Sequence, residues 1–203
     1  MSIVRISPTQ VEAIRRDPDC VGDLLDLDPD PPDPPEESKP GLLLRILSRI
    51  FLARRSGTPP REPSRPRVLA PVPQSDIYDA DKYWHILHFL FTGTAWDGTQ
   101  PRAFLASGGS PVGRDNGYGP PRLFIPEELQ AISSFLETLT FEEFASGYIS
   151  KNVTDTELYY WRPGSTAEER SADLEILWEI VGEIRQFVAN AAKHGNGILV
   201  DIY

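Results

Sequence analysis

The stretch Asp79-Ala-Asp-Lys-Tyr-Trp-His-Ile-Leu-His-Phe-Leu-Phe-Thr-Gly93 predicts the helix around which the rest of the chain is organised. We expect Asp79 to be its N-cap and Gly93 to end it, because Asp accepts hydrogen bonds from first-turn amides and Gly adopts the left-handed conformation without strain. At 3.6 residues per turn, the apolar side chains share one broad face that would lie against the core. That face consists of Tyr83, Ile86, Leu87, Leu90 and Phe91.

A polar column is predicted on the opposite side of the same helix. Asp81, His85 and His88 are spaced i, i+4 and i+7, and Trp84 lies at the edge of the column. Two imidazoles at this spacing can face one point, where they would bind a metal ion or act as an acid and a base. The competing interpretation is that His85 or His88 hydrogen-bonds and holds the glycine-rich loop at 107–121, because buried polar groups are normally paired. A metal centre needs further ligands at motif spacing, so we predict no metal and no cofactor.

The second informative region is the loop 107–121, which holds five glycines and three prolines in fifteen residues. We expect strands on either side of it, at 103–106 and 122–125. A loop of this composition turns sharply or lets its backbone approach a neighbour closely. It lacks the Gly-Lys-Ser/Thr ending of a P-loop, so its glycines alone do not predict a phosphate site.

Polar side chains of this region complete a candidate pocket if the loop folds over His85. The plainer alternative is that Tyr118 packs as a plug and that Arg122 pairs with a carboxylate. The candidate pocket consists of Asp81, Trp84, His85, His88, Asp115, Tyr118 and Arg122.

Capping signals mark the remaining elements. Ser7-Pro8-Thr9-Gln10 opens a helix after an N-terminal strand at 3–6. A long amphipathic helix begins near Thr166, with Gly195 after its end and a closing strand at 198–202. Apolar strands at both ends of the chain invite pairing. The sequence therefore predicts an α+β fold, in which a small mixed sheet with the N- and C-terminal strands is packed by the central histidine-bearing helix and the long C-terminal helix.

Composition divides the chain into a domain, at 1–25 and 76–203, and an insertion at 26–75. The insertion is rich in proline and charge and offers little apolar surface to offset the entropy of ordering. Within it, residues 42–55 predict a cationic amphipathic helix. Three roles stay open for this helix: docking on the core, contacting a partner or a membrane surface, and pairing with the acidic linker before it. Its apolar and basic faces are represented by Leu42, Ile46, Ile50, Arg45 and Arg49.

Charge and composition limit the classes of function. The formal net charge of −10 argues against nucleic-acid binding, which requires basic residues facing the phosphates. Cys20 is the single cysteine, no apolar run approaches the roughly 18 residues of a membrane span, and the first residues do not resemble a signal peptide. We therefore expect a cytoplasmic protein without a nucleic-acid partner. The sequence does not determine its oligomeric state.

Several blocks, in their order along the chain, carry a family resemblance. The segments 79–93, 108–113 and 117–122, followed by the C-terminal helix and closing strand, resemble the YfbM-like family of bacterial proteins, a domain-of-unknown-function family. The resemblance covers the N-terminal strand and helices and then 76–203, and the insertion is long for the family. It implies a compact α+β domain. It implies no activity, so no catalytic residue is carried over.

Two hypotheses on function follow. The first is a non-enzymatic binding or protein-interaction module, of the inhibitor or immunity type, whose acidic surface meets a basic partner. The second is a small-molecule-binding protein or enzyme that uses His85, His88, Asp115 and Tyr118 beside the glycine-rich loop. The sequence contains neither Gly-x-Ser-x-Gly nor His-Glu-x-x-His, and this lack of a complete catalytic motif favours the first.

Overall fold

The computed structural model describes residues 1–25, 69–115, 117–150, 158–159, 161–164 and 166–203. The predictions for residues 26–68, including the cationic helix at 42–55, lie outside these ranges. The last part of the predicted insertion is described and packs on the domain. Val72 is buried there, and its amide donates to the carbonyl of Leu24 at 3.2 Å.

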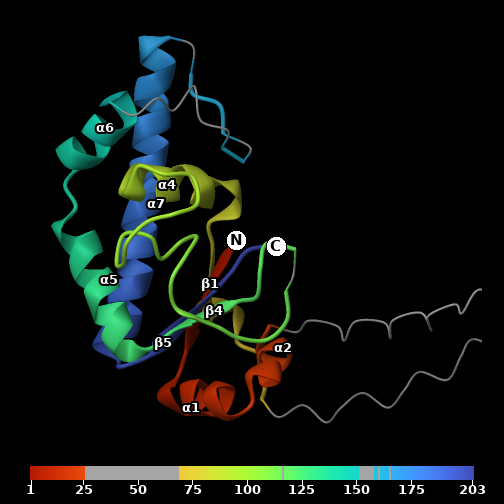
Figure 1. Ribbon diagram of the computed structural model, residues 1–203. Helices are drawn as coiled ribbons and strands as arrows, with labels where there is room; N and C mark the ends of the chain where they lie inside the picture. Colours follow the sequence, from red (N-terminus) through yellow and green to blue (C-terminus); the bar gives the residue numbers. More distant parts are fainter. Residues whose placement is uncertain (26–68, 116, 151–157, 160, 165) are drawn as a thin grey trace, which may run out of the picture.

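One sheet contains both terminal strands, as the sequence predicts, and β1 and β5 are direct neighbours in it. Every strand pairing among the described residues is antiparallel, so the sheet is not mixed. The helices between β4 and β5 return the chain to the sheet in the opposite direction (Figure 1). In sheet order, the strands are β2 (Ile77–Asp79), β1 (Ser2–Ile6), β5 (Gly197–Asp201), β4 (Arg122–Phe124) and β3 (Ser110–Pro111).

The helices follow the predicted capping signals. The first begins with a complete capping box, in which Ser7 Oγ accepts from the amide of Gln10 and Gln10 Oε1 accepts from the amide of Ser7. The last begins with the equivalent box of Thr166 and Glu169. The helices are α1 (Pro8–Arg16), α2 (Val21–Leu24), α4 (Trp84–Thr92), α5 (Pro126–Thr138), α6 (Phe141–Ser150) and α7 (Ala167–Lys193).

Both faces of the sheet are covered, so successive residues of one strand enter different hydrophobic clusters. Ile198 and Val200 of β5 face a large cluster formed with α4, α5 and α7. Leu199 faces a smaller cluster formed with α1 and α2. Figure 1 shows α5 and α7 on one side of the strands and the short helices α1 and α2 on another. For this reason β5 is buried along its whole length.

The central helix differs from its prediction in two ways. It begins at Trp84 because Asp79 is the last residue of β2, and one 3₁₀ turn separates the two. The carboxylate of Asp79 accepts from the amide of Asp81 at 2.8 Å, so it caps this turn and not the helix. The helix also has no exposed polar side, because residues 84–91 are all buried. Its predicted end is confirmed, with Gly93 in the left-handed conformation at φ 85°.

The strand predicted at 103–106 is wrong. These residues form a turn, although their apolar side chains are buried. The carbonyls of Phe104 and Leu105 accept hydrogen bonds from the guanidinium of Arg122, at 3.1 and 2.7 Å. A side chain thus satisfies the backbone groups that a strand would present to its neighbour.

Candidate functional site

His85 holds two backbone segments together from inside α4. The residue is 1% exposed, its Nε2 donates to the carbonyl of Ala95 at 2.8 Å, and its Nδ1 accepts from the amide of Tyr159 at 2.9 Å. These contacts require a neutral imidazole with the proton on Nε2. Burial lowers its pKa, which favours the same neutral form. Both ring nitrogens are therefore engaged in structural hydrogen bonds.

His88 lies one turn further along α4 and is completely buried. Its Nε2 donates to the carbonyl of Asp97 at 3.1 Å, and its Nδ1 has no hydrogen-bond partner among the described residues. The pKa of His88 falls to about 4, mainly because of burial and further because of the positive charge of Arg122. The two histidines thus anchor the loop 94–97. The sequence-based interpretation assigned them to the glycine-rich loop instead.

Trp84 is the centre of a group of rings that reaches the surface. It is 2% exposed and stacks on His85 with ring centroids 4.7 Å apart. Its centroid lies 5.7 Å from that of Trp96, 6.4 Å from that of Tyr118 and 6.5 Å from that of Tyr159. These outer three rings remain 51%, 44% and 38% exposed. We call Trp96, Tyr118 and Tyr159 the aromatic face.

The glycine-rich loop meets α4 through Tyr118, which confirms that the two regions lie together. One of its glycines also allows the close backbone approach that the composition predicts. Gly109 has φ 68°, and a Cβ at this position would lie 2.8 Å from the carbonyl oxygen of Leu123 in β4. Glycine is required there both by conformation and by space.

Asp115 and Arg122 support backbone structure. Asp115 Oδ1 accepts from the amides of Gly117 and Gly119, at 2.7 and 2.9 Å, and so shapes the loop. Arg122 holds the turn described above, and burial lowers its pKa to about 10, although the nearby carboxylate of Asp201 opposes this shift. Neither residue lines the cavity described below, and the pocket role that the sequence suggests for them stays a prediction.

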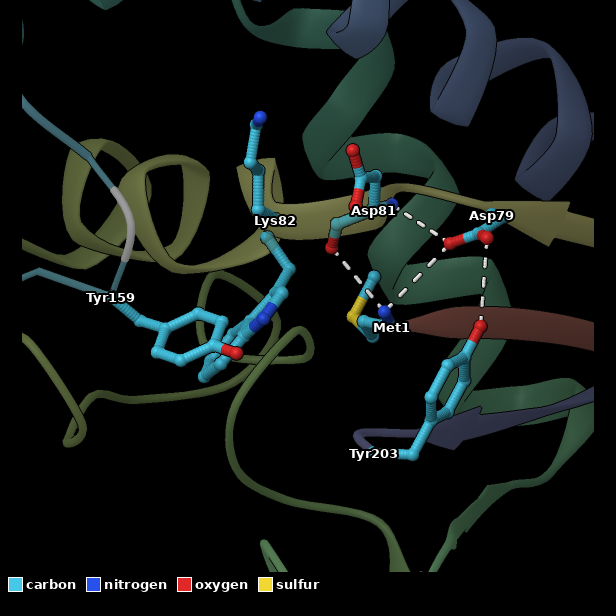
Figure 2. Close-up of a pocket in the computed structure, with 7 residues that line it drawn as sticks. Met1, Asp79, Asp81, Lys82, Tyr159 and Tyr203 are labelled. Atoms are coloured by element: carbon cyan, nitrogen blue, oxygen red, sulfur yellow. Dashed lines mark hydrogen bonds and ion pairs between the residues drawn. The ribbon is translucent and has the colours of Figure 1, made fainter.

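A cavity of about 270 Å³ opens beside the aromatic face, where the end of β2 meets both termini of the chain. Trp84 and Tyr159 contribute to its wall, so the cavity and the aromatic face are continuous. Figure 2 shows Asp79 and Tyr203 joined by a dashed line, with Tyr159 on the other side of Met1. The other lining residues are Met1, Asp79, Asp81, Lys82 and Tyr203.

The two carboxylates of the cavity are in different situations. Asp79 accepts from the amide of Asp81, lies 3.7 Å from the amino nitrogen of Met1, and accepts from the hydroxyl of Tyr203 at 3.5 Å. The carboxylate of Asp81 makes no hydrogen bond or ion pair within the part of the chain that the structure describes. Asp81 also has φ 47°, a left-handed conformation that residues other than glycine rarely adopt, with Asp and Asn among the most tolerant of them. Asp81 therefore brings an exposed carboxylate, unpaired among the described residues, to the residues that line the cavity.

Sequence reasoning found Asp81 and Trp84 but missed most of this cavity. Tyr203 and Met1 reach it only because β1 pairs with β5 and with β2, and Tyr159 reaches it through its amide contact with His85. The one usable signal was the predicted pairing of the terminal strands, which brings the ends of the chain together. No local motif indicates the cavity.

Among the described residues, no three His, Cys, Asp or Glu side chains gather in a way that could hold a metal ion. No helix in the described ranges combines the length and the apolar composition needed to cross a membrane.

The fold and the site define an antiparallel α+β domain with a cavity of aromatic and acidic residues beside its paired terminal strands. The family model described as Domain of unknown function (DUF1877) matches residues 1–200, so the chain belongs to this family. The crystal structure of a protein of unknown function, YfbM from Escherichia coli, has a similar fold. Its TM-score is 0.57 at 19% sequence identity, over 98% of this chain and 96% of that chain. The resemblance to the YfbM-like family is thus confirmed. No curated protein matches the chain.

Proposed function

We propose that this protein is a non-enzymatic interaction module that binds a basic protein partner through the aromatic face and the adjoining cavity. The observation that carries the proposal is the exposure of Trp96, Tyr118 and Tyr159 as one group around a buried tryptophan. Tryptophan and tyrosine dominate the energetics of protein interfaces, because they bury a large area at a small cost in conformational entropy. Exposed apolar surface of this kind marks interaction sites.

The rings are held in place before any partner arrives. His85 and His88 fix the backbone on both sides of Trp96 by donating hydrogen bonds to the carbonyls of Ala95 and Asp97, at 2.8 and 3.1 Å. His85 also fixes the amide of Tyr159. A surface that is ordered in advance loses less entropy on association, so a given contact area gives tighter binding. In this proposal the histidines act as supports for a binding surface.

Charge supports a basic partner. The chain carries a formal charge of −10, and the aromatic face is bordered by the exposed acidic residues Asp79, Asp81 and Asp97. Complementary charge speeds association and rejects acidic competitors. An acidic module that covers a basic surface of another protein is the arrangement used by inhibitor and immunity proteins, which is the form of the proposal that we favour.

The alternative function, a small-molecule enzyme using His85, His88, Asp115 and Tyr118, has weaker support. Both ring nitrogens of His85 are engaged, His88 is completely buried, and Asp115 binds the backbone of its own loop. A general acid or base must reach the substrate proton within hydrogen-bonding distance. Tyr118 is exposed, but the engagement of the other three residues leaves the second hypothesis without an acid–base pair.

The proposal is tested by placing a photo-cross-linking amino acid at Tyr118 in cells of the natural host. The matched control carries the same group at Phe141, an exposed aromatic on α6 outside the aromatic face. We expect a discrete, basic protein to be cross-linked from position 118 only. The purified pair should then bind directly, with affinity that falls with salt and falls at least about 10-fold in Trp96→Ala.

Two outcomes would reject the proposal. One is equal cross-linking from positions 118 and 141, which would indicate nonspecific contact. The other is a purified partner that binds Trp96→Ala as tightly as the unchanged protein, because the aromatic face would then be irrelevant to the complex.

A further inference from the structure

The cavity beside the aromatic face has the size and chemistry of a pocket for one side chain. We infer that it accepts a lysine or arginine side chain of the partner, with the carboxylate of Asp81 as counter-ion and the rings of Trp84 and Tyr159 as walls. This inference rests on the proposed function and adds the chemical group that is recognised.

Size favours a single side chain over a metabolite. The cavity holds about 270 Å³, whereas pockets for drug-sized ligands occupy roughly 300–1,000 Å³. It also opens next to three exposed rings, so a partner that lies on the aromatic face can insert one side chain without a separate binding event. The geometry is that of an anchor residue at the edge of an interface.

The rings of the wall suit a cation. Trp84 and Tyr159 both line the cavity, with centroids 6.5 Å apart and planes inclined by 34°. The faces of tryptophan and tyrosine attract ammonium and guanidinium groups through their quadrupoles. The long methylene chain of lysine or arginine would lie against the same rings, with the charged end reaching water or a carboxylate.

The carboxylates identify which group pairs with that cation. Asp79 is already occupied by the amide of Asp81, the amino nitrogen of Met1 and the hydroxyl of Tyr203. Asp81 is another lining residue of the same cavity, and its carboxylate has no such partner within the described residues. Asp81 is therefore the group left to neutralise an incoming charge.

Two lining residues carry positive charge, namely Lys82 and the amino group of Met1, and the latter already faces the carboxylate of Asp79 at 3.7 Å. Lys82 therefore provides the sharpest test. Its side chain is exposed and projects in the same direction as that of Asp81 in Figure 2. If the occupant is a cation, removing the charge of Lys82 relieves repulsion and strengthens binding. If the occupant is an anion, the same change weakens binding. The sign of the effect decides between the two.

The experiment is an NMR titration that follows the indole N–H signals of Trp84 and Trp96, with Trp178 of α7 as a remote internal control. The probes are the N-acetyl, N-methylamide derivatives of lysine, arginine, norleucine and glutamate. We expect saturable shifts at Trp84 with lysine and arginine alone, because norleucine has a similar chain without the charge. Trp178 should not respond.

Three variants complete the test. Asp81→Asn should weaken binding of the lysine probe about three- to five-fold, the range for a partly exposed ion pair, and asparagine tolerates the left-handed backbone. Lys82→Gln should strengthen binding about two-fold by the same argument. Glu127→Gln on α5 changes the net charge as much as Asp81→Asn but does not line the cavity, so it should leave binding unchanged.

Each failure has a distinct meaning. Three results would overturn the assignment. The norleucine probe would bind as tightly as the lysine probe, or neither cationic probe would cause a shift. In the third case, the glutamate probe would bind more tightly than the lysine probe, and Lys82→Gln would weaken its binding. A partner captured at Tyr118 that binds Asp81→Asn normally would overturn this inference and leave the proposed function standing. If the cationic probes bind but no partner is found at the aromatic face, this inference stands and the proposed function is overturned.

Discussion

Helices α4 and α7 are stabilised in different ways, and this difference explains where the candidate site lies. α7 has 27 residues, a complete capping box at Thr166 and a left-handed glycine, Gly195, after its end. α4 has nine residues and no side-chain cap at its N-terminus. One helix is specified mainly by its own sequence. The other persists because the surrounding chain contacts it from every side.

The difference also decides what each helix does with its polar residues. The long helix has Glu175, Glu179 and Glu183 on its solvent side, as an amphipathic helix normally does. The short helix buries its two histidines and uses them to hold backbone groups of other segments. The buried histidines of this short helix hold the segments that carry Trp96 and Tyr159, and in this way they order the aromatic face.

The largest predicted effect concerns the tryptophans of the two helices. Trp84→Ala removes a side chain that is 2% exposed and contacts the whole aromatic face, so we expect it to lower the free energy of unfolding by about 3–5 kcal/mol. Trp178→Ala in α7 removes a half-buried ring that packs on Phe144 and under Arg185, and should cost only about 1–2 kcal/mol. Urea unfolding of both variants measures which one loses more free energy of unfolding. Equal or reversed losses would mean that α4 is not the more tightly packed helix.

The second prediction concerns the pH dependence of stability that His88 gives to α4. The pKa of His88 in the folded protein is about 4, below the ordinary 6.5. Between pH 4 and pH 6.5, this imidazole therefore binds a proton in the unfolded chain but not in the folded chain. The stability contributed by neutral His88 is therefore present above pH 6.5 and is lost as the pH falls towards 4. Its full size is about 3 kcal/mol.

His88→Gln tests this directly, because glutamine keeps a donor for the carbonyl of Asp97 but does not titrate. The free energy of unfolding, measured by urea titration from pH 7.5 to 4, should fall less steeply in the variant than in the unchanged protein. Parallel curves for the two proteins would show that His88 is not the titrating group.

Much of the fold follows from the sequence, because many of its signals are local. The capping box at Ser7, the helix start at Thr166 and the glycine stops at Gly93 and Gly195 need only neighbouring residues to act, and the structure has all of them. The strand error at 103–106 has the opposite origin. A buried apolar run resembles a strand until one knows that Arg122, 17 and 18 residues along, binds its carbonyls.

The candidate site was less predictable for the same reason. The spacing of His85 and His88 is visible in the sequence, but the loop that they hold is determined by three-dimensional packing. The cavity is assembled by strand pairing that joins Met1, Asp79 and Tyr203 from distant parts of the chain. A periodic pattern predicts which residues share a helix face, and it says nothing about which distant segment will cover that face.

The third prediction, with a smaller effect, concerns the side-chain cap at the N-terminus of α7. Thr166→Ala removes the hydroxyl that accepts from the amide of Glu169 at 3.1 Å, so we expect a loss of about 1 kcal/mol. Thr166→Ser keeps this oxygen and should be close to neutral. Hydrogen exchange of the first-turn amides, together with urea unfolding, would report the change. A loss of the same size in the serine variant would point to packing of the threonine methyl group instead of capping.

The smallest effect is predicted at Asp81, in the turn before α4, and it has the opposite sign. Holding a non-glycine residue in the left-handed region costs roughly 1–2 kcal/mol, whereas glycine loses about 0.5–1 kcal/mol more backbone entropy on folding. With φ 47° at this position, Asp81→Gly should therefore raise the free energy of unfolding by about 0.5 kcal/mol, while Asp81→Asn should leave it nearly unchanged. The urea midpoints of the three proteins measure this difference. A destabilised glycine variant would show that the aspartate side chain contributes to folding. A stabilised one that also loses the lysine probe would show that the chain tolerates strain at the residue that binds.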